Sequence, residues 1–419
     1  MNSRERVEKA LNHGETDRIP VDFGSTAVTG ISASVVNKLR KYFGLDSSSP
    51  VKVIEPYQIL GEIADDLKQK LWVDCIGIGG KNNLFGYENG NWKEWKLFDG
   101  TPVLVSGLFN TKVEDDGSIF QYPEGDKTVS PSARLPKGGY YFDAIIRQKP
   151  IDDSKLNIEG NLEEFKEITE TDLDYFEKEA GFLFENTDFA IVGSFGGTSF
   201  GDIALVPATF LKDPKGIRDI EEWYISIIKR KSYIYEIFNR QCEIALKNFE
   251  MIYQAVADKI SVVFITGTDF GTQRSPFISI DTYRELFKPF HQKINCWVHS
   301  KTKWKTFLHS CGAIEPLIPE FIDAGFDILN PVQISAVGMD PALLKEKYGK
   351  DLVLWGGGVD TQKILPFGTP EEVREEVEKR LKIFSKGGGF IFNAIHNIQA
   401  KTPVENVVSM IESVHNFKY

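Results

Sequence analysis

The stretch TFLHSCGAIEPLIPEFIDAGFDILN, residues 306–330, contains the repeating unit from which the fold is built. Its two ends, TFLHSC and FDILN, are short and mostly apolar, and the residues between them fit an amphipathic helix. Apolar strands that alternate with helices are typical of a parallel sheet that is buried on both faces. The unit recurs, because FAIVGSF, SVVFITG, LVLWGG and FIFNAIH each precede a helix or a loop that leads to one.

The number of these units predicts the architecture. With early strands near Ile19 and Asp74 included, about eight βα units are available, which predicts an α/β fold of the (β/α)8, or TIM-barrel, class. A doubly wound open sheet is the alternative. It is disfavoured because no Gly-x-Gly-x-x-Gly follows any strand. In a barrel, the chemistry lies at the carboxyl ends of the strands.

Two helix starts are clear from the sequence. Thr369 is followed by Pro370 and, three positions on, by Glu372, which predicts a capping box with proline at the first helical position. Gly387 is expected to end that helix. Thr402 is followed by Pro-Val-Glu, and the same reasoning predicts that Thr402 caps the last helix.

The stretch from about residue 87 to residue 144 has a different pattern. Asn-Gly, Asp-Gly and Glu-Gly pairs separate alternating segments such as WKEWKLF and TPVLVSG. Such pairs are typical of tight turns between antiparallel strands. We expect an antiparallel β excursion within a single domain that covers residues 1–419.

Composition excludes several classes of function. The 419 residues carry a formal net charge of −11, which argues against binding to nucleic acid or to an anionic membrane. No apolar run is long enough for a transmembrane helix, and the charged N-terminus does not resemble a signal peptide. Four scattered cysteines predict a reduced, cytoplasmic protein without a disulfide framework.

A His-x-Cys pair at the end of TFLHSC is the strongest chemical signal. His309 and Cys311 have the same parity in a strand, so both side chains leave on one side and can reach one metal ion. The alternative is a buried free cysteine beside a hydrogen-bonded histidine. His396 ends the last predicted strand, on the same rim of a closed barrel. The three side chains together predict a zinc site with an open fourth position, which is the geometry of a catalytic zinc.

Further polar residues follow other predicted strands. Asp269 and Gln273, in GTDFGTQRSPFIS, are candidates for catalysis and for substrate binding, and Gly267 and Gly271 are expected to let the backbone approach a ligand. The alternative is a loop that only caps the next helix. WGGGVD, residues 355–360, fits either a pocket floor or a tight βα turn. The remaining substrate-binding candidates are Asn330, Gln333, Asp360 and Asn393.

The sequence resembles the uroporphyrinogen decarboxylase superfamily, and specifically its corrinoid-dependent methyltransferase branch. The resemblance extends over nearly the whole chain outside the β excursion. It rests on SRERVEKALNHGETDRIPVDF (residues 3–23), GTDFGTQRSPFISIDTYRELFKPFHQK (267–293), FLHSCGAIEPLIPEFIDAGFDILNPVQ (307–333), WGGGVDTQKILPFGTPEEVREEV (355–377) and FIFNAIHNIQAKTPVENV (390–407).

The resemblance implies a TIM barrel with its site at the carboxyl-terminal mouth. Methyltransferases of the branch bind zinc through a His-x-Cys pair and a later cysteine, so His309 and Cys311 match the pair while His396 replaces the cysteine. Decarboxylases also have histidine at that later position, but they lack the His-x-Cys pair. They further carry arginines after the first strand, where this chain reads GSTAVTGIS, residues 24–32.

These features together favour a methyltransferase. No Asp-x-His-x-x-Gly places a cobalamin-ligating histidine in this chain, so the cobalamin is expected on a separate corrinoid protein. The expected methyl donor is a small methoxylated compound or an alcohol, which would make the reaction an O-demethylation. A uroporphyrinogen decarboxylase and a non-catalytic corrinoid-binding or chaperone protein remain as alternatives. The direction of transfer, the substrate and the oligomeric state stay open.

Overall fold

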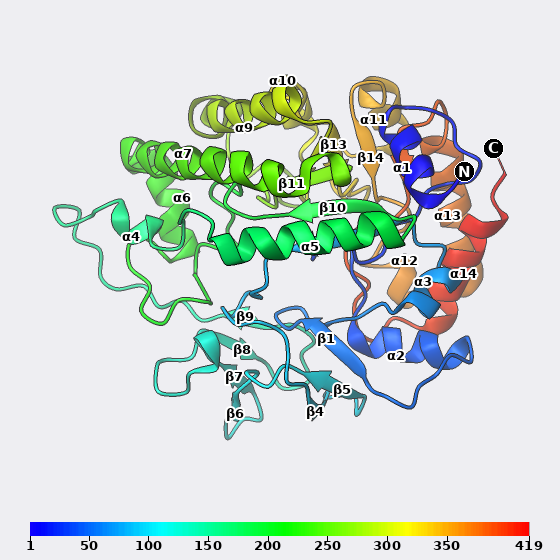
Figure 1. Cartoon of the computed structure of the whole chain (residues 1–419), viewed down its shortest axis with the longest axis horizontal. Coiled ribbons are helices and arrows are strands. Elements are labelled where there is room, and N and C mark those ends of the chain that lie inside the picture. The colour runs from blue at the N-terminus through cyan, green and yellow to red at the C-terminus, as the bar shows by residue number, and fades with distance from the viewer. Residues whose placement is uncertain (419) are drawn as a thin grey trace.

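The computed structural model describes residues 1–418, and a sheet of seven parallel strands forms its centre (Figure 1). In order across the sheet, the strands are β15 (Phe390–Ile391), β14 (Val353–Trp355), β13 (Ile328–Asn330), β12 (Lys305–His309), β11 (Val262–Thr266), β10 (Ala190–Ser194) and β3 (Cys75–Gly79).

A short segment around Val21 closes this sheet into a barrel. Val21 forms parallel bridges to Phe392, just beyond β15, and to Val73, just before β3. The amide of Asp22 donates to the carbonyl of Phe392 at 2.9 Å, and the amide of Asp74 donates to the carbonyl of Val21 at 2.7 Å. The segment therefore takes the place of the eighth strand, and the predicted barrel class is confirmed.

Helices cover the outside of the barrel, as the alternating sequence predicts (Figure 1). The longer ones are α1 (Ser3–Leu11), α2 (Ala33–Tyr42), α5 (Glu170–Asn186), α6 (Ile220–Lys229), α7 (Lys231–Val256), α9 (Lys288–Lys301), α11 (Pro341–Tyr348), α13 (Pro370–Phe384) and α14 (Val404–Asn416). The shorter ones are α3 (Asp65–Lys70), α4 (Glu159–Leu162), α8 (Ile280–Thr282), α10 (Ile318–Asp323) and α12 (Ile364–Phe367), with single turns η1 (Pro123–Gly125), η2 (Ala257–Lys259), η3 (Tyr283–Phe287) and η4 (Glu315–Leu317). No helix within residues 1–418 combines the length and the apolar character needed to cross a membrane.

The two predicted helix starts have different outcomes. Helix α13 begins with the predicted capping box, in which Thr369 accepts from the amide of Glu372 and Glu372 accepts from the amide of Thr369. The prediction for Thr402 is wrong, because the cap residue of α14 is Pro403 and makes no side-chain cap bond. The Thr402 hydroxyl instead donates to the carbonyl of Gln399 at 2.8 Å, which folds it back onto the preceding loop.

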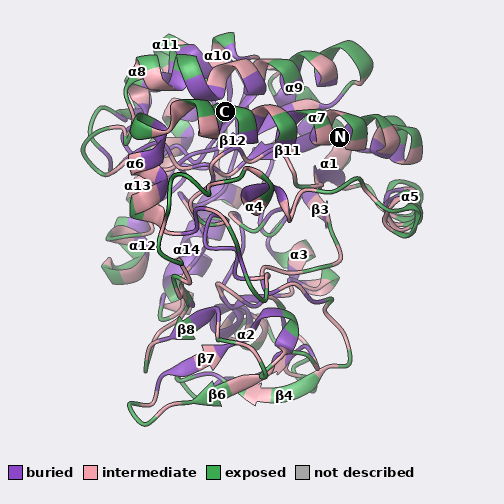
Figure 2. Ribbon diagram, turned by 90° about the vertical axis from the view of Figure 1, so that its left-hand side faces the viewer, coloured by how far each residue is buried: buried purple, intermediate pink, exposed green. Residues whose placement is uncertain are grey.

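The barrel interior is packed, and its amino-terminal end is closed. Alternate strand residues point inward and form one buried cluster with residues of α1, coloured as buried in Figure 2. The cluster contains Val7, Ala10, Leu11, Cys75, Ala190, Val192, Val262, Phe307, Ile328, Val353, Trp355 and Ile391. The amide of Arg4 donates to the carbonyl of Asp188, just before β10, so α1 lies across the start of the strands. Only the carboxyl-terminal end is left for a site.

The predicted β excursion forms two small sheets, drawn at the bottom of Figure 1. One is antiparallel and contains β6 (Thr111–Val113), β7 (Ile119–Gln121), β8 (Ala133–Leu135) and β9 (Asp143–Ala144). The other contains β4 (Lys93–Lys96) and β5 (Pro102–Val105), together with β1 (Val51–Glu55) and β2 (Leu60–Gly61). The excursion therefore starts earlier than predicted, because β1 pairs in parallel with β5. That the chain is a single domain stays a prediction.

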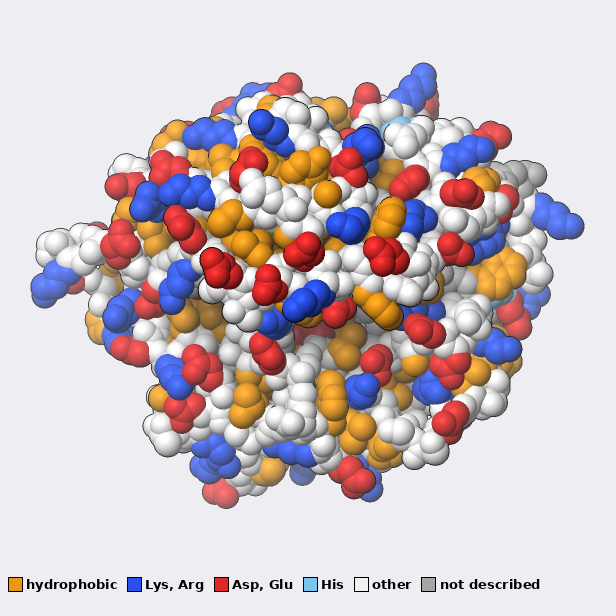
Figure 3. Space-filling view, viewed as in Figure 1, with side chains coloured by type: hydrophobic (Ala, Val, Ile, Leu, Met, Phe, Trp, Pro, Cys, Tyr) orange, Lys and Arg blue, Asp and Glu red, His pale blue; other side chains and the backbone are white. Residues whose placement is uncertain are grey.

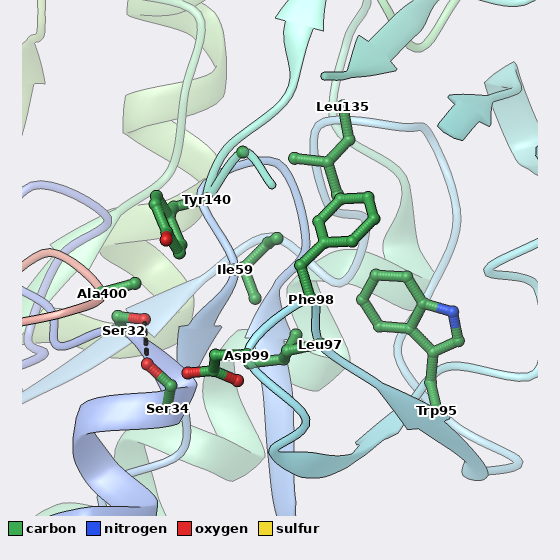
Figure 4. A pocket seen from close by; sticks show the side chains of 11 residues that line it. Ser32, Ser34, Ile59, Trp95, Leu97, Phe98, Asp99, Leu135, Tyr140 and Ala400 are labelled. Carbon is green, nitrogen blue, oxygen red and sulfur yellow. Dashed lines mark hydrogen bonds between the residues drawn. The ribbon is translucent and has the colours of Figure 1, made fainter. Parts of the chain in front are cut away.

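The β excursion contacts the loop that follows β15. The Asn397 amide donates to the Gln58 side chain at 2.8 Å, and Lys401 lies 4.7 Å from the centre of the Tyr140 ring. Figure 4 shows the narrow cavity of about 10 Å³ at this junction, lined by side chains from the excursion, from the start of α2 and by Ala400. It has room for about one water molecule, so it is not a substrate site. Because the loop after β15 leaves the carboxyl end of the barrel, the excursion stands at that end.

Candidate metal centre

The three predicted metal ligands lie together at the carboxyl end of the barrel. His309 is the last residue of β12, Cys311 follows two residues later, and His396 comes from the loop after β15. Their nitrogen and sulfur atoms all lie within 4.8 Å of one another. The Nε2 atom of His309 is 3.4 Å from the Cys311 sulfur, and the ring centres of the two histidines are 5.4 Å apart. A single ion could therefore reach all three side chains.

His396 reaches this cluster from a loop and not from the end of a strand. The prediction that FIFNAIH is one strand is wrong beyond its first residues, because β15 ends at Ile391. The backbone carbonyl of Asn393 still accepts from the amide of Gly358, as the carbonyl of Ile391 accepts from the amide of Gly356, so pairing with the neighbouring segment reaches Asn393. The side-chain amide of Asn393 donates to the carbonyl of Asp22 at 2.6 Å, and from this residue on the backbone is irregular and brings His396 beside His309.

A buried hydrogen bond fixes the tautomer of His309. Its Nδ1 atom lies 2.6 Å from the side-chain oxygen of Asn330, and the Asn330 amide nitrogen donates to the carbonyl of Trp355 at 2.9 Å. That second bond sets the orientation of the amide, so its oxygen faces the ring and Nδ1 must carry the hydrogen. The lone pair is thus on Nε2, the atom that faces Cys311, as a metal ligand requires.

The protonation of the three side chains suits a cation. Burial lowers the pKa of His309 to about 4 and that of His396 to about 4, so both rings are neutral and can donate a lone pair. Burial and the adjacent Asp269 carboxylate raise the pKa of the Cys311 thiol well above its usual range. A thiolate at this position therefore needs a positive charge beside it. Two imidazoles and a thiol form a donor set that fits zinc.

Asp269 lies at the edge of this cluster, as predicted for a residue of the site. Its Oδ1 accepts from the amide of Cys311 at 2.6 Å and is 3.9 Å from the Nε2 of His309. Close packing of two glycines brings the loops together, because a Cβ on Gly271 would lie 2.7 Å from the carbonyl oxygen of Cys311 and one on Gly312 would lie 2.3 Å from Gly271. The expectation that Gly271 faces a ligand is therefore wrong, since it faces backbone.

The other predicted substrate residues differ in where they lie. Gln333 is buried at the cluster, and its side-chain oxygen accepts from the amide of Gly312 at 2.6 Å. Asp360 caps its own loop by accepting from the amides of Gln362 and Lys363. Gln273 is exposed on the loop after β11. Asn330 and Asn393 are bonded as described above. The structure thus brings Asn330 and Gln333 to the cluster, while Gln273 and Asp360 hold no bond to it.

The glycines of WGGGVD pack against the neighbouring strand. The amide of Gly356 donates to the carbonyl of Ile391, and a Cβ on Gly358 would lie 2.2 Å from the Phe392 ring. Gly356 and Gly357 both have a positive φ, which side chains other than glycine rarely adopt. Of the two alternatives for this segment, the tight βα turn is the one observed.

Sequence reasoning missed two buried acids at the same end of the barrel. Burial raises the pKa of Asp22 to about 6, although Ser25 and the Trp355 indole donate to its carboxylate. Burial, and next the charge of Asp269, raise the pKa of Asp202 to about 7. Asp269 was predicted as a site residue because it follows an apolar strand segment, and Asp22 and Asp202 follow such segments too. Asp202 was not recognised because it lies eight residues beyond the end of β10.

Comparison with solved structures shows the fold over the whole chain. A methyltransferase from Methanosarcina mazei superposes with a TM-score of 0.53, covering 100% of this chain and 99% of that one. The two sequences are 16% identical.

Sequence comparison gives the family. A uroporphyrinogen decarboxylase of Psychromonas ingrahamii is 36% identical over 77 residues, which is 18% of this chain and 21% of that protein. One of Methylococcus capsulatus is 30% identical over 95 residues, or 23% of this chain and 25% of that protein. The chain thus spans about a quarter or less of these relatives' length. The family model described as uroporphyrinogen decarboxylase (URO-D) matches residues 208–417, half of the chain, which includes all three residues of the metal cluster. The chain therefore belongs to the uroporphyrinogen decarboxylase family.

Proposed function

We propose that this protein is a zinc-dependent methyltransferase that moves a methyl group between a small methoxylated compound or alcohol and the cobalamin of a separate corrinoid protein. The observation that carries the proposal is the cluster of His309, Cys311 and His396, whose donor atoms lie within 4.8 Å of one another. Three protein ligands with a free fourth position are typical of catalytic zinc.

The donor set favours an oxygen substrate. Zinc held by one thiolate and two neutral imidazoles would keep a formal charge of +1, and as a Lewis acid it would polarise an ether or alcohol oxygen. A second thiolate would cancel that charge. The site of this chain therefore suits release of a methyl group from oxygen, the reaction class of an O-demethylation.

The surrounding residues hold the ligands in place. Asn330 orients His309, and Asp269 and Gln333 hold the backbone amides of Cys311 and Gly312. Bonds of this kind keep metal ligands in their binding geometry. We assign Asp269, which lies beside His309 and Cys311, to orienting the substrate.

Two observations support a methyltransferase over a uroporphyrinogen decarboxylase. A substrate with eight carboxylates needs paired guanidinium groups, yet the segment after the first barrel strand, residues 24–32, contains no arginine. In the structure this segment is tied to the barrel, since Ser25 donates to Asp22 and the amide of Gly30 donates to Asn397. The fold is also that of the Methanosarcina methyltransferase. A non-catalytic corrinoid-binding protein would bind its partner without turnover.

Methyl transfer to free cob(I)alamin tests the proposal. The zinc-loaded protein should transfer the methyl group of anisole, with a rate that tracks enzyme concentration and falls when a chelator removes the metal. Transfer that is absent with zinc bound, or that persists unchanged after chelation, contradicts the proposal.

A further inference from the structure

The loop that follows β10 is fastened over the end of β11, next to the metal cluster. The amide of Gly267 donates to the Ser199 hydroxyl at 3.2 Å, and the Thr268 hydroxyl donates to the carbonyl of Phe200 at 2.9 Å. These two hydrogen bonds join two consecutive residues of one loop to two consecutive residues of the other, so the loops are held in a fixed register. Asp202 is therefore carried to the carboxyl end of the barrel by a rigid connection.

One oxygen of the Asp202 carboxyl group faces the end of β11. Oδ1 accepts from the amide of Ala204 at 2.9 Å, while Oδ2 lies 3.1 Å from where a Cβ on Gly267 would stand. Gly267 precedes Asp269 by two residues, and Asp269 holds the amide of Cys311. The Asp202 carboxyl group, which belongs to the loop after β10, thus lies beside the end of β11 from which Asp269 extends. No described residue donates a hydrogen bond to Oδ2 of Asp202.

The charged groups around Asp202 favour its neutral form. Asp269 faces it from the end of β11, and burial with that negative charge raises its pKa to about 7. Burial, and next the charges of Asp269 and Asp202, raise the pKa of the Tyr224 hydroxyl on α6 to about 12, so this group also stays neutral. On the far side, Arg218 is already paired with Glu164 at 2.8 Å. Asp202 therefore holds a proton that it can release near neutral pH.

A small cavity adjoins Asp202. Its volume is about 40 Å³, and Ser199, Trp223 and Gln241 also line it. The buried indole nitrogen of Trp223 has no hydrogen-bond partner among residues 1–418. The cavity has room for a water molecule, which the indole and the carboxyl group would both bind. Such water gives Asp202 a source from which to regain a proton.

Resting on the function proposed above, we propose that Asp202 donates the proton that the leaving oxygen takes up when its methyl group departs. The methyl carbon–oxygen bond breaks with its electron pair on oxygen, and the electron pair of cob(I)alamin forms the new cobalt–carbon bond. The oxygen then receives a proton from Asp202, directly or across one water. The product is an alcohol or phenol, and the Asp202 carboxylate regains a proton from solvent, relayed through the water in the cavity so that no hydroxide is left there.

Infrared titration tests the protonation of Asp202 without any reaction. In metal-free wild-type protein, the stretch of a neutral carboxyl group should disappear with a midpoint at about pH 7, and Asp202→Asn should lack this signal. Glu376→Gln is the matched control, because Glu376 is partly buried and has a raised pKa but lies on α13. The component that titrates at about pH 6 belongs to Asp22 and should persist in Asp202→Asn. A component with its midpoint at about pH 7 and the same amplitude in Asp202→Asn as in the wild type overturns the proposal.

Methyl transfer to cob(I)alamin from two aryl ethers tests the role in catalysis. The two ethers are anisole and 4-nitroanisole. The phenolate that leaves from anisole needs a proton, whereas the 4-nitrophenolate that leaves from 4-nitroanisole does not. Asp202→Asn should therefore lose about 100-fold in rate with anisole and keep the wild-type rate with 4-nitroanisole, which also shows that the variant is folded. Zinc content and both rates of Glu376→Gln should equal those of the wild type.

The outcomes separate the two proposals. Equal losses on both ethers, or an unchanged anisole rate in Asp202→Asn, overturn the role of Asp202 alone. A zinc-loaded wild-type protein that demethylates neither ether contradicts the proposed function, and with it this role, whatever the infrared titration shows.

Discussion

Replacing His396 tests both the ligand set and the reasoning about its charge. His396 supplies one of three donor atoms that lie within 4.8 Å of one another, so His396→Ala leaves only two protein ligands. Loss of a bond that merely orients a ligand weakens metal binding by about 10- to 100-fold, and loss of the ligand itself should cost more. His396→Ala should therefore lose zinc and methyl transfer together.

His396→Cys separates metal binding from Lewis acidity. Cysteine suits the same tetrahedral position, so this variant should keep its zinc. The second thiolate removes the formal positive charge, and transfer from an oxygen substrate should slow by roughly 10- to 100-fold, or about 1–3 kcal/mol of transition-state stabilisation. The assays are a zinc competition titration with a chelating dye and methyl transfer from anisole to cob(I)alamin.

His415→Ala is the control for these variants, because His415 is a half-buried histidine on α14 that stacks on Trp72. It should bind zinc and turn over like the wild type. If His396→Ala keeps full zinc occupancy while it loses activity, His396 is a substrate contact, as in the decarboxylases, and the three-ligand site is refuted.

Three further predictions concern the ligand support, the acid stability and the substrate charge. Asn330→Ala should weaken zinc binding by about 10- to 100-fold in the same titration, because the His309 tautomer is no longer fixed. Arg284 and then Lys288 lower the pKa of Glu320 to about 2, so the stability that this carboxylate contributes is present above its usual pKa and is lost as the pH falls toward 2. At pH 7, Glu320→Gln should have a lower melting temperature than the wild type. In acid, the difference between the two melting temperatures should become smaller. An equal difference at both pH values would show that the ion pairs contribute nothing. Uroporphyrinogen III should not be decarboxylated, since its carboxylates would meet no arginines after the first strand, and coproporphyrinogen formed in proportion to enzyme would show the opposite.

The barrel could be predicted from the sequence because its signals are local. Each apolar strand and each amphipathic helix is read from neighbouring residues, and the capping box at Thr369 lies within four positions. The His309 and Cys311 pair is likewise local. His396 was added because the closure of a barrel brings all strand ends to one rim, although the structure places it in the loop beyond β15.

What the sequence could not show depends on contacts between distant segments. Asn330 was expected to bind substrate, but its partner follows from the register in which His309 of β12 pairs with Asn330 of β13. The cap at Thr402 failed because the hydroxyl finds a carbonyl in the preceding loop. Asp202 was missed because its burial and its proximity to Asp269 arise only when two loops pack together.

The zinc content of the purified protein tests the central claim most directly. The protein is prepared without chelators, supplied with zinc, freed of unbound metal and subjected to elemental analysis. The cluster of His309, Cys311 and His396 predicts about one zinc per chain. Zinc that stays far below one per chain after this treatment would contradict the metal centre and would favour the decarboxylase alternative, which needs no metal.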